Sequence, residues 1–342
     1  MTMKDFLQAA PKAELGVRLE GAMNPATLQV IANQNDIPLT TKHFRELMAQ
    51  IQKPDLKRAD ELARVASTWI NTPLELARVA YDAATALWKS GVHYAEITVS
   101  PGLYEGMGLR LDDLFAALND GRDRAQRAWG IRVQWLLAVP RDEPRRADDV
   151  ARYAASVTGG RAGVAGLALL GNEELQPAGQ FERAFKSAEK HEVPRVVQTN
   201  GHNGAEGLLS TLDTLRPNRL IDAWDAWTSP DLLDRFAEEG VGVLAGISRG
   251  LKNGRLAQAS AYPLRTLLDA GVPVTLSVDA PSHLGATLSD AYFAVLEDGG
   301  VSVEDVTVLL LNGVRMSFLD ESEKVALEAQ FVTALEAAKA LL

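Results

Sequence analysis

The chain has 342 residues, of which 46% are hydrophobic, 23% charged and 6% aromatic, a composition typical of a globular protein with an ample core. Its formal net charge of −10 is spread along the sequence without a basic block, which argues against a nucleic-acid partner. Because cysteine is absent, disulfides, thiolate nucleophiles and cysteine-held metals are excluded. No stretch has the roughly 18 apolar residues that span a bilayer, and residues 1–10 lack a signal-peptide pattern. We therefore expect a cytoplasmic protein without a membrane partner.

Short β-branched or aliphatic runs alternate with longer segments of helical spacing, as in repeated β-α units. Eight such runs are predicted to be parallel strands: residues 13–19, 93–99, 132–138, 164–170, 195–199, 219–221, 242–244 and 272–278. Since eight parallel strands close a barrel, the predicted fold class is α/β, a (β/α)8 or TIM barrel. Such a barrel carries its functional residues at the carboxyl ends of the strands.

A helix-rich insertion, residues 24–90, follows the first predicted strand. Asn24-Pro25, Thr40 and Thr72-Pro73 each place a helix-starting signal there, and we expect these helices to lie over one barrel mouth. Residues 304–311 and 321–342 are patterned as closing helices. Because neither a linker nor a low-complexity tract interrupts the chain, we predict a single domain over residues 1–342.

Several motifs are distributed over nearly the whole chain: Pro11-Lys12-Ala13-Glu14-Leu15, Leu19-Glu20-Gly21-Ala22, Tyr94-Ala95-Glu96 with Ser100-Pro101, Gly171-Asn172-Glu173, Thr275-Leu276 with Asp279 and Pro281, and Asn312 with Ser317-Phe318-Leu319. Together they resemble the adenosine deaminase family of the amidohydrolase superfamily. From Gln198 to Asp279 the family pattern fits without a gap. Departures from the pattern in that stretch are therefore substitutions.

The resemblance implies a zinc site, and most of its residues are replaced here. Members of the family hold zinc with two histidines on the first strand, which correspond to Gly16 and Arg18. Gly16 has no side chain, and Arg18 is a permanent cation that would repel a metal. The histidine and the glutamate of the family's next motif correspond to Gln198 and Gly201. We therefore expect no metal cofactor.

Two further family positions fall after the sixth and last strands. The catalytic histidine corresponds to Asp222; of the paired aspartates, the metal-binding one is kept as Asp279, and the one that contacts the purine ring is Ala280. Zinc deamination needs an imidazole-rich cage to activate water and a carboxylic acid to move its proton. One carboxylate cannot do both, so a degenerate metal site is expected.

Arg18 and Asp279 lie on the first and last strands, which are neighbours in a closed barrel. One interpretation is a structural ion pair in which the guanidinium fills the space left by the cation. The alternative is that Arg18 faces the pocket and clamps a carboxylate or phosphate of a ligand. Asp222 is a candidate acid or base beside Trp224, although a packing role is open for that tryptophan.

Neutral and retained polar positions complete the candidate site. Gln198 and Asn200 are suited to orient an amide, sugar or heterocycle, or to satisfy loop backbone. Glu20 and Gly171 are retained where the family contacts its nucleoside, which implies a small-molecule, nucleoside-like ligand. The sequence leaves the oligomeric state open, a homo-oligomer included.

Three hypotheses follow. The leading one is a metal-independent hydrolase or lyase that acts on a small polar or nucleoside-derived substrate through Asp222 and Asp279, with Arg18 as the cationic partner. The second is a catalytically dead binding or regulatory protein that kept the fold. The third is a deaminase with a rebuilt metal site.

Overall fold

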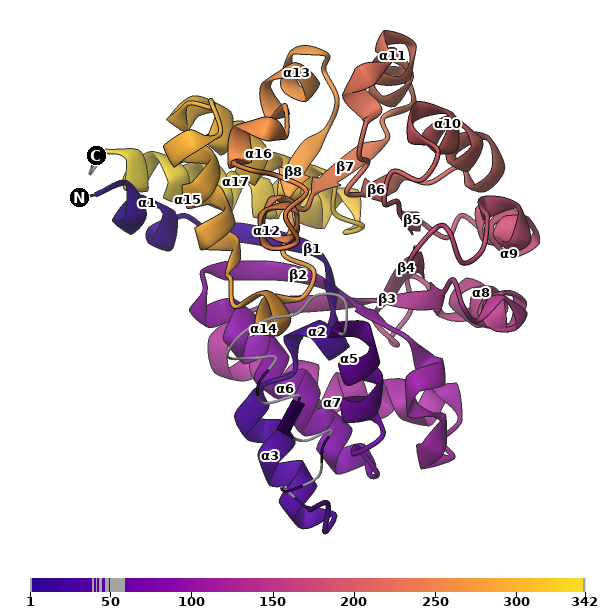
Figure 1. The fold of residues 1–342 in the computed structure, drawn as a ribbon. Coiled ribbons are helices and arrows are strands. Elements are labelled where there is room, and N and C mark those ends of the chain that lie inside the picture. Colours follow the sequence, from indigo (N-terminus) through magenta and orange to yellow (C-terminus); the bar gives the residue numbers. More distant parts are fainter. Residues whose placement is uncertain are drawn as a thin grey trace.

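The computed structural model describes residues 2–340 and 342, except 39, 41, 43–44, 47–48 and 50–58. Its described strands form one eight-stranded parallel sheet in the order β1 to β8, surrounded by helices (Figure 1). The strands are β1 (Lys12–Arg18), β2 (Val92–Val99), β3 (Arg132–Pro140), β4 (Val164–Leu170), β5 (Arg195–Gln198), β6 (Arg219–Ile221), β7 (Gly242–Ala245) and β8 (Val274–Leu276). The predicted (β/α)8 barrel is confirmed, with strand bounds within two residues of those expected.

Helices precede, connect and follow the strands along the chain, and most of them lie outside the sheet (Figure 1). They are α1 (Met3–Ala9), α2 (Leu19–Ala22), α3 (Pro25–Gln34), α5 (Ala59–Ser67), α6 (Pro73–Lys89), α7 (Leu111–Trp129), α8 (Ala147–Val157), α9 (Glu182–Lys190), α10 (Gly204–Leu215), α11 (Pro230–Glu239), α12 (Ile247–Lys252), α13 (Leu264–Asp269), α14 (Pro281–Leu284), α15 (Leu288–Asp298), α16 (Val303–Arg315) and α17 (Glu321–Lys339). In the part of the chain that is described, none is long and apolar enough to cross a membrane.

The insertion after β1 is helical, as expected. The Asn24 side chain accepts from Ala26 N at the start of α3, and Thr72 forms a capping box with Glu75 at the start of α6. Helix α5 packs against α2, which follows the carboxyl end of β1, and Arg64 on α5 pairs with Asp142 just after β3. The insertion thus reaches the carboxyl ends of the first three strands. The helix expected after Thr40 lies largely outside the described residues.

The barrel closes between β8 and β1 through a mixture of backbone and side-chain contacts. Arg18 N donates to Asp279 O at 2.7 Å, and the Ser277 hydroxyl donates to Leu15 O at 2.9 Å. Val278 N donates to the buried Glu14 carboxyl, at 3.1 Å from Oε1. Apolar side chains fill the barrel interior, so the barrel is a packed core and its chemistry is confined to the strand ends.

Candidate functional site at the carboxyl ends of the strands

Asp279 lies three residues beyond the end of β8, beside the carboxyl end of β1. Its Oδ2 atom is 3.4 Å from Nε of Arg18, and the side chains of Asp279 and Arg18 are 8% and 16% exposed. The ion pair expected from the adjacency of the first and last strands is therefore present. Because the same two residues also share a backbone hydrogen bond, the pair lies across the β1–β8 junction.

A second guanidinium, which sequence reasoning missed, also contacts Asp279. Arg249 lies in α12, directly after β7, and its Nε atom donates to Asp279 Oδ1 at 3.2 Å while Nη2 donates to Oδ2. This fork matches the two carboxylate oxygens, the geometry that favours arginine over lysine. The sequence signal that could have identified Arg249 is its position just beyond the end of the seventh predicted strand. With Arg18 and Arg249 both in contact, two cations face a single carboxylate.

Asp222 follows β6 and is 2% exposed. Asp222 and Ala223 both have left-handed backbone conformations, with φ of 74° and 41°, which cost energy in residues other than glycine. Two hydroxyl groups hold this turn: Tyr262 donates to Asp222 O at 2.8 Å, and Thr199 Oγ1 accepts from Ala223 N at 3.1 Å. These two hydrogen bonds hold the strained turn in place, and the turn in turn sets the direction of the Asp222 carboxyl group.

The Asp222 carboxyl is buried with little direct compensation. Its Oδ1 atom has no hydrogen-bond partner among the described residues. Burial raises the pKa of Asp222 to about 7; the positive charge of Arg249 opposes this rise and the negative charge of Asp279 adds to it. Gly246, at the end of β7, leaves room for the group, since a Cβ atom there would overlap with Asp222 Oδ1. The arrangement leaves a carboxyl that exchanges its proton near neutral pH.

Gln198 and Asn200 connect the loops that follow β4 and β5. Gln198 Oε1 accepts from Gly171 N at 3.0 Å, and Asn200 Oδ1 accepts from Glu173 N at 3.1 Å. The Glu173 carboxylate returns a bond by accepting from Asn200 N at 2.7 Å. The sequence leaves two roles open for these amides, ligand orientation and hydrogen bonding to loop backbone. In the structure, both amide oxygens accept hydrogen bonds from loop backbone.

Trp224 packs within the protein and is 3% exposed. Its ring meets Trp227 and Tyr262 edge to face, at centroid distances of 6.3 and 5.2 Å. The guanidinium carbon of Arg255 lies over the Trp224 ring, 4.4 Å from its centroid. With one face covered by Arg255, the indole supports the Asp222 turn and does not form an open platform.

A cavity of about 200 Å³ opens at the mouth of the barrel and is lined by Arg18, Glu20, Gly171 and Arg141, among others. Glu20 is buried and accepts a hydrogen bond from the Tyr104 hydroxyl at 3.1 Å. Burial raises the pKa of the Glu20 carboxyl above its usual value. The other candidate residues, Asp222 and Asp279 among them, are not part of the lining. Arg18 is thus the residue that both lines this cavity and contacts Asp279.

Gly16, which we expect to correspond to the family's first ligand histidine, has apolar surroundings. Gly16 forms a bulge in β1, with φ of 87°, and its missing Cβ would face methyl carbons of Leu244 and Ile221 at 3.2 and 3.5 Å. Among the residues the structure describes, no three histidine, aspartate or glutamate side chains group closely enough to hold a metal ion.

Comparison with known proteins agrees with the sequence resemblance. Residues 11–334 match the family model of adenosine deaminase. The chain is 29% identical to the putative adenosine/adenine deaminase of Streptomyces coelicolor over 326 residues, which cover 92% of this chain and 93% of that protein. It is 28% identical to the adenosine deaminase of Erwinia tasmaniensis over 255 residues, with coverage of 74% and 76%.

Two solved structures share the fold. One is an amidohydrolase from Burkholderia ambifaria with bound zinc, at a TM-score of 0.89 and 22% identity, covering 100% of this chain and 95% of that one. The other is the adenine deaminase of Arthrobacter aurescens, at a TM-score of 0.85 and 21% identity, with coverage of 96% and 99%.

Proposed function

The chain belongs to the adenosine deaminase family, and we propose that it is a zinc-independent enzyme of that family which acts on a small polar or nucleoside-derived substrate. The observation that carries the proposal is the contrast between its two strand-end carboxyl groups. Asp279 is matched by two guanidinium groups, whereas Asp222 is buried and its pKa is raised by burial to about 7. Carboxyl groups in unlike surroundings are the usual basis for separate acid and base roles.

The residues at the family's metal positions do not fit zinc. Gly16 offers no ligand atom and faces methyl groups, and Gln198 Oε1 already accepts a backbone hydrogen bond. The retained Asp279 is in contact with the guanidinium groups of Arg18 and Arg249, which would repel a divalent cation. The chemistry that we propose therefore uses no metal ion.

The proposed chemistry uses Asp222 as the acid or base. At neutral pH this carboxyl is divided between its protonated and ionised forms, so it can donate or accept a proton with little penalty. The guanidinium groups of Arg18 and Arg249 are the partners for negative charge that develops on substrate oxygen or nitrogen. Hydrolysis, elimination and rearrangement each need only these two functions.

Substrate recognition is assigned to the cavity at the barrel mouth. Its volume of about 200 Å³ is below the 300–1,000 Å³ typical of ligand pockets, so it would hold only part of a nucleoside-sized substrate as it stands. Arg18 and Arg141 in the lining favour a substrate with an acceptor-rich or anionic group, and the buried carboxyl of Glu20 suits a sugar hydroxyl. Relatives named for adenosine and adenine support a nucleoside-like substrate.

A second candidate is a protein that binds such a ligand without turning it over. It is favoured by the burial of Asp222 and by the absence of both Asp222 and Asp279 from the cavity lining. This candidate keeps the same pocket and predicts binding that is indifferent to the protonation of Asp222.

The deciding experiment combines metal analysis with turnover. Untagged protein is assayed for zinc by mass spectrometry and for turnover of adenosine, other nucleosides and the base adenine, with and without 1,10-phenanthroline. We expect less than a tenth of a zinc per chain and chelator-insensitive turnover that Asp222→Asn abolishes. Asp225→Asn is the matched control, because Asp225 also has a left-handed conformation after β6 but is 40% exposed.

Each other result overturns the proposal in a distinct way. Zinc near one per chain with chelator-sensitive deamination would establish a rebuilt metal site. Tight binding of a nucleoside without turnover would establish the binding protein. Turnover that survives Asp222→Asn would remove Asp222 from the chemistry.

A further inference from the structure

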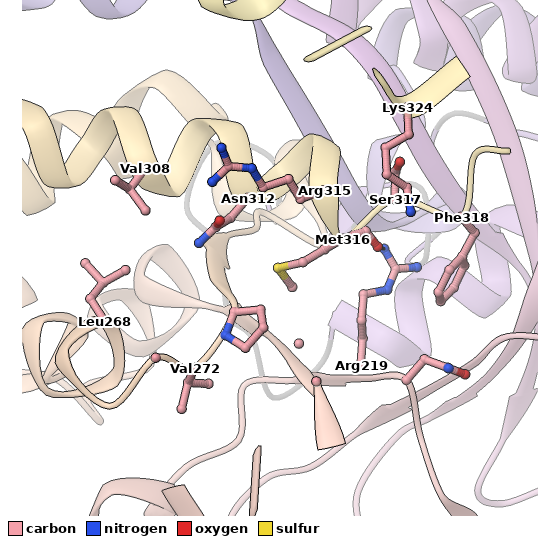
Figure 2. Close-up of a pocket in the computed structure, with 15 residues that line it drawn as sticks. Arg219, Leu268, Val272, Val308, Asn312, Arg315, Met316, Ser317, Phe318 and Lys324 are labelled. Carbon is pink, nitrogen blue, oxygen red and sulfur yellow. Dashed lines mark hydrogen bonds between the residues drawn. The ribbon is translucent and has the colours of Figure 1, made fainter. Parts of the chain in front are cut away.

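A second pocket lies at the opposite end of the barrel from the candidate active site. It has a volume of about 580 Å³, within the range of small-molecule sites. Arg219 and Gly242, the first residues of β6 and β7, line it together with Pro273, which precedes β8 (Figure 2). The C-terminal part of α16 and the loop that follows form the opposite wall. Its position at the amino-terminal strand ends makes it independent of the site described above.

The charge of this pocket is opposite to that of the whole protein. Its 15 lining residues contain the cations Arg219, Arg315 and Lys324 and no aspartate or glutamate, although the chain carries a net charge of −10. Each cation has a carboxylate partner outside the lining: Arg219 pairs with Glu96, Arg315 with Glu328 and Lys324 with Glu321. The pairs of Arg315 and Lys324 involve exposed groups, and such pairs are weak and readily exchanged.

The lining also changes character from one end to the other. In Figure 2, Leu268, Val272 and Val308 lie at one end, while Arg219 and Ser317 lie at the other. Val308 is 40% exposed, so the apolar end is open to solvent. The pocket therefore offers an apolar surface that leads to a basic, polar end.

Two polar atoms at the basic end lack partners. Ser317 Oγ and Arg219 Nε are buried and have no hydrogen-bond partner among the described residues, and the two residues are 3% and 1% exposed. Unpartnered buried polar atoms cost folding free energy, and these two lie beneath the basic end, where the Phe318 ring covers the Arg219 guanidinium. Lys324 is 22% exposed and adds a more accessible cation at this end.

From this polarity we propose that the pocket binds a small amphipathic anion: a carboxylate, phosphate or sulfonate on an apolar body. The anionic group lies at the end formed by Arg219, Ser317 and Lys324, and the apolar body lies against Leu268, Val272 and Val308. A charge-assisted bond to lysine and the burial of apolar surface act on separate parts of such a ligand. The two contributions can therefore be tested one at a time.

The test uses 8-anilinonaphthalene-1-sulfonate as the anionic probe and N-phenyl-1-naphthylamine, which has the same rings without the sulfonate, as the neutral one. Fluorescence titration of the folded full-length protein measures the Kd of each. We expect saturable binding of the sulfonate, weakened about tenfold by Lys324→Gln, while the Kd of the neutral probe stays unchanged. Val308→Ser is expected to weaken both probes, because it removes apolar surface that both use.

Lys186→Gln is the matched control, since Lys186 also pairs with a glutamate on its own helix but lies on α9, away from the pocket. Circular dichroism melting checks that every variant is folded. The proposal is overturned if the sulfonate shows no saturable binding, if Lys324→Gln leaves its Kd unchanged, or if that variant weakens both probes equally. Loss of sulfonate binding in Arg18→Gln but not in Lys324→Gln would also overturn it, by assigning the probe to the barrel mouth.

Discussion

Replacing Asp222 by asparagine should stabilise the protein, and the gain should grow with pH. A carboxyl whose pKa is higher in the folded than in the unfolded protein binds its proton more tightly when folded. Its contribution to stability is therefore complete below the unfolded pKa and is lost as pH rises through the folded one. A pKa raised from 3.8 to about 7 corresponds to a loss of about 4 kcal/mol at alkaline pH. Asparagine has the same shape, cannot ionise and tolerates the left-handed conformation.

Urea unfolding of wild type and Asp222→Asn across a range of pH measures this effect. The advantage of the variant in unfolding free energy should be about 2 kcal/mol near pH 5 and about 4 kcal/mol near pH 9. A constant offset from altered hydrogen bonding would shift the whole curve, so the slope between these two pH values is the diagnostic quantity. Titration of groups distant from Asp222 cancels in the difference.

Asp225→Asn provides the control, because the Asp225 carboxyl is 40% exposed and paired with Arg255. It makes the same change of side chain without the burial of Asp222. A difference for Asp222→Asn that does not change with pH would refute the reasoning, since it would mean that burial does not disfavour the charged form of Asp222 in the folded protein.

Three further substitutions test the packing of the site. Gly246→Ala places a Cβ atom on Asp222 Oδ1, so it should cost about 2 kcal/mol in urea unfolding and abolish any turnover that depends on Asp222. Arg249→Met leaves Asp279 with one guanidinium partner, and a loss of about 2 kcal/mol is expected at neutral pH; an unchanged midpoint in urea would show that Arg18 suffices. Gly16→His introduces the residue type that we expect at the family's first ligand position, but it forces a left-handed conformation against Leu244. It should therefore cost about 1–3 kcal/mol and leave the zinc content, measured by mass spectrometry, at the wild-type level.

The barrel could be predicted from the sequence because each strand is an apolar run with clear borders. The differences arise at the barrel's closure and rim. β3 extends to Pro140, because that residue pairs with Leu170 of β4. β8 is shorter than expected, because beyond Leu276 the backbone of Val278 bonds to the Glu14 side chain instead of a neighbouring strand. A side chain that takes the place of a neighbouring strand as hydrogen-bond acceptor leaves no local signal in the sequence.

The candidate site was only partly predictable. The contact of Arg18 with Asp279 follows from closure of the barrel, which makes the first and last strands neighbours. The second guanidinium was missed, because the direction of Arg249 depends on how the short helix α12 leaves β7. The raised pKa of Asp222 was equally inaccessible, since it results from burial by residues distant in the sequence. The position of a residue just after a strand predicts that it belongs to the site. The pKa of its side chain can be judged only once the residues packed around it are known.

The residues that we expect at the family's metal positions are linked to one another through the fold. Gly16 forms the bulge in β1 and faces methyl groups of Ile221 in β6 and Leu244 in β7, and Arg18 and Arg249 balance the carboxylate of Asp279. Restoring one histidine would therefore meet both an apolar wall and two cations. Asp222, by contrast, keeps an unpartnered oxygen and a strained turn held by two hydroxyl groups. A strained backbone and a buried polar atom without a hydrogen-bond partner are usually kept where they serve function, despite their cost to folding. We therefore expect Asp222 to be the central residue of the proposed chemistry.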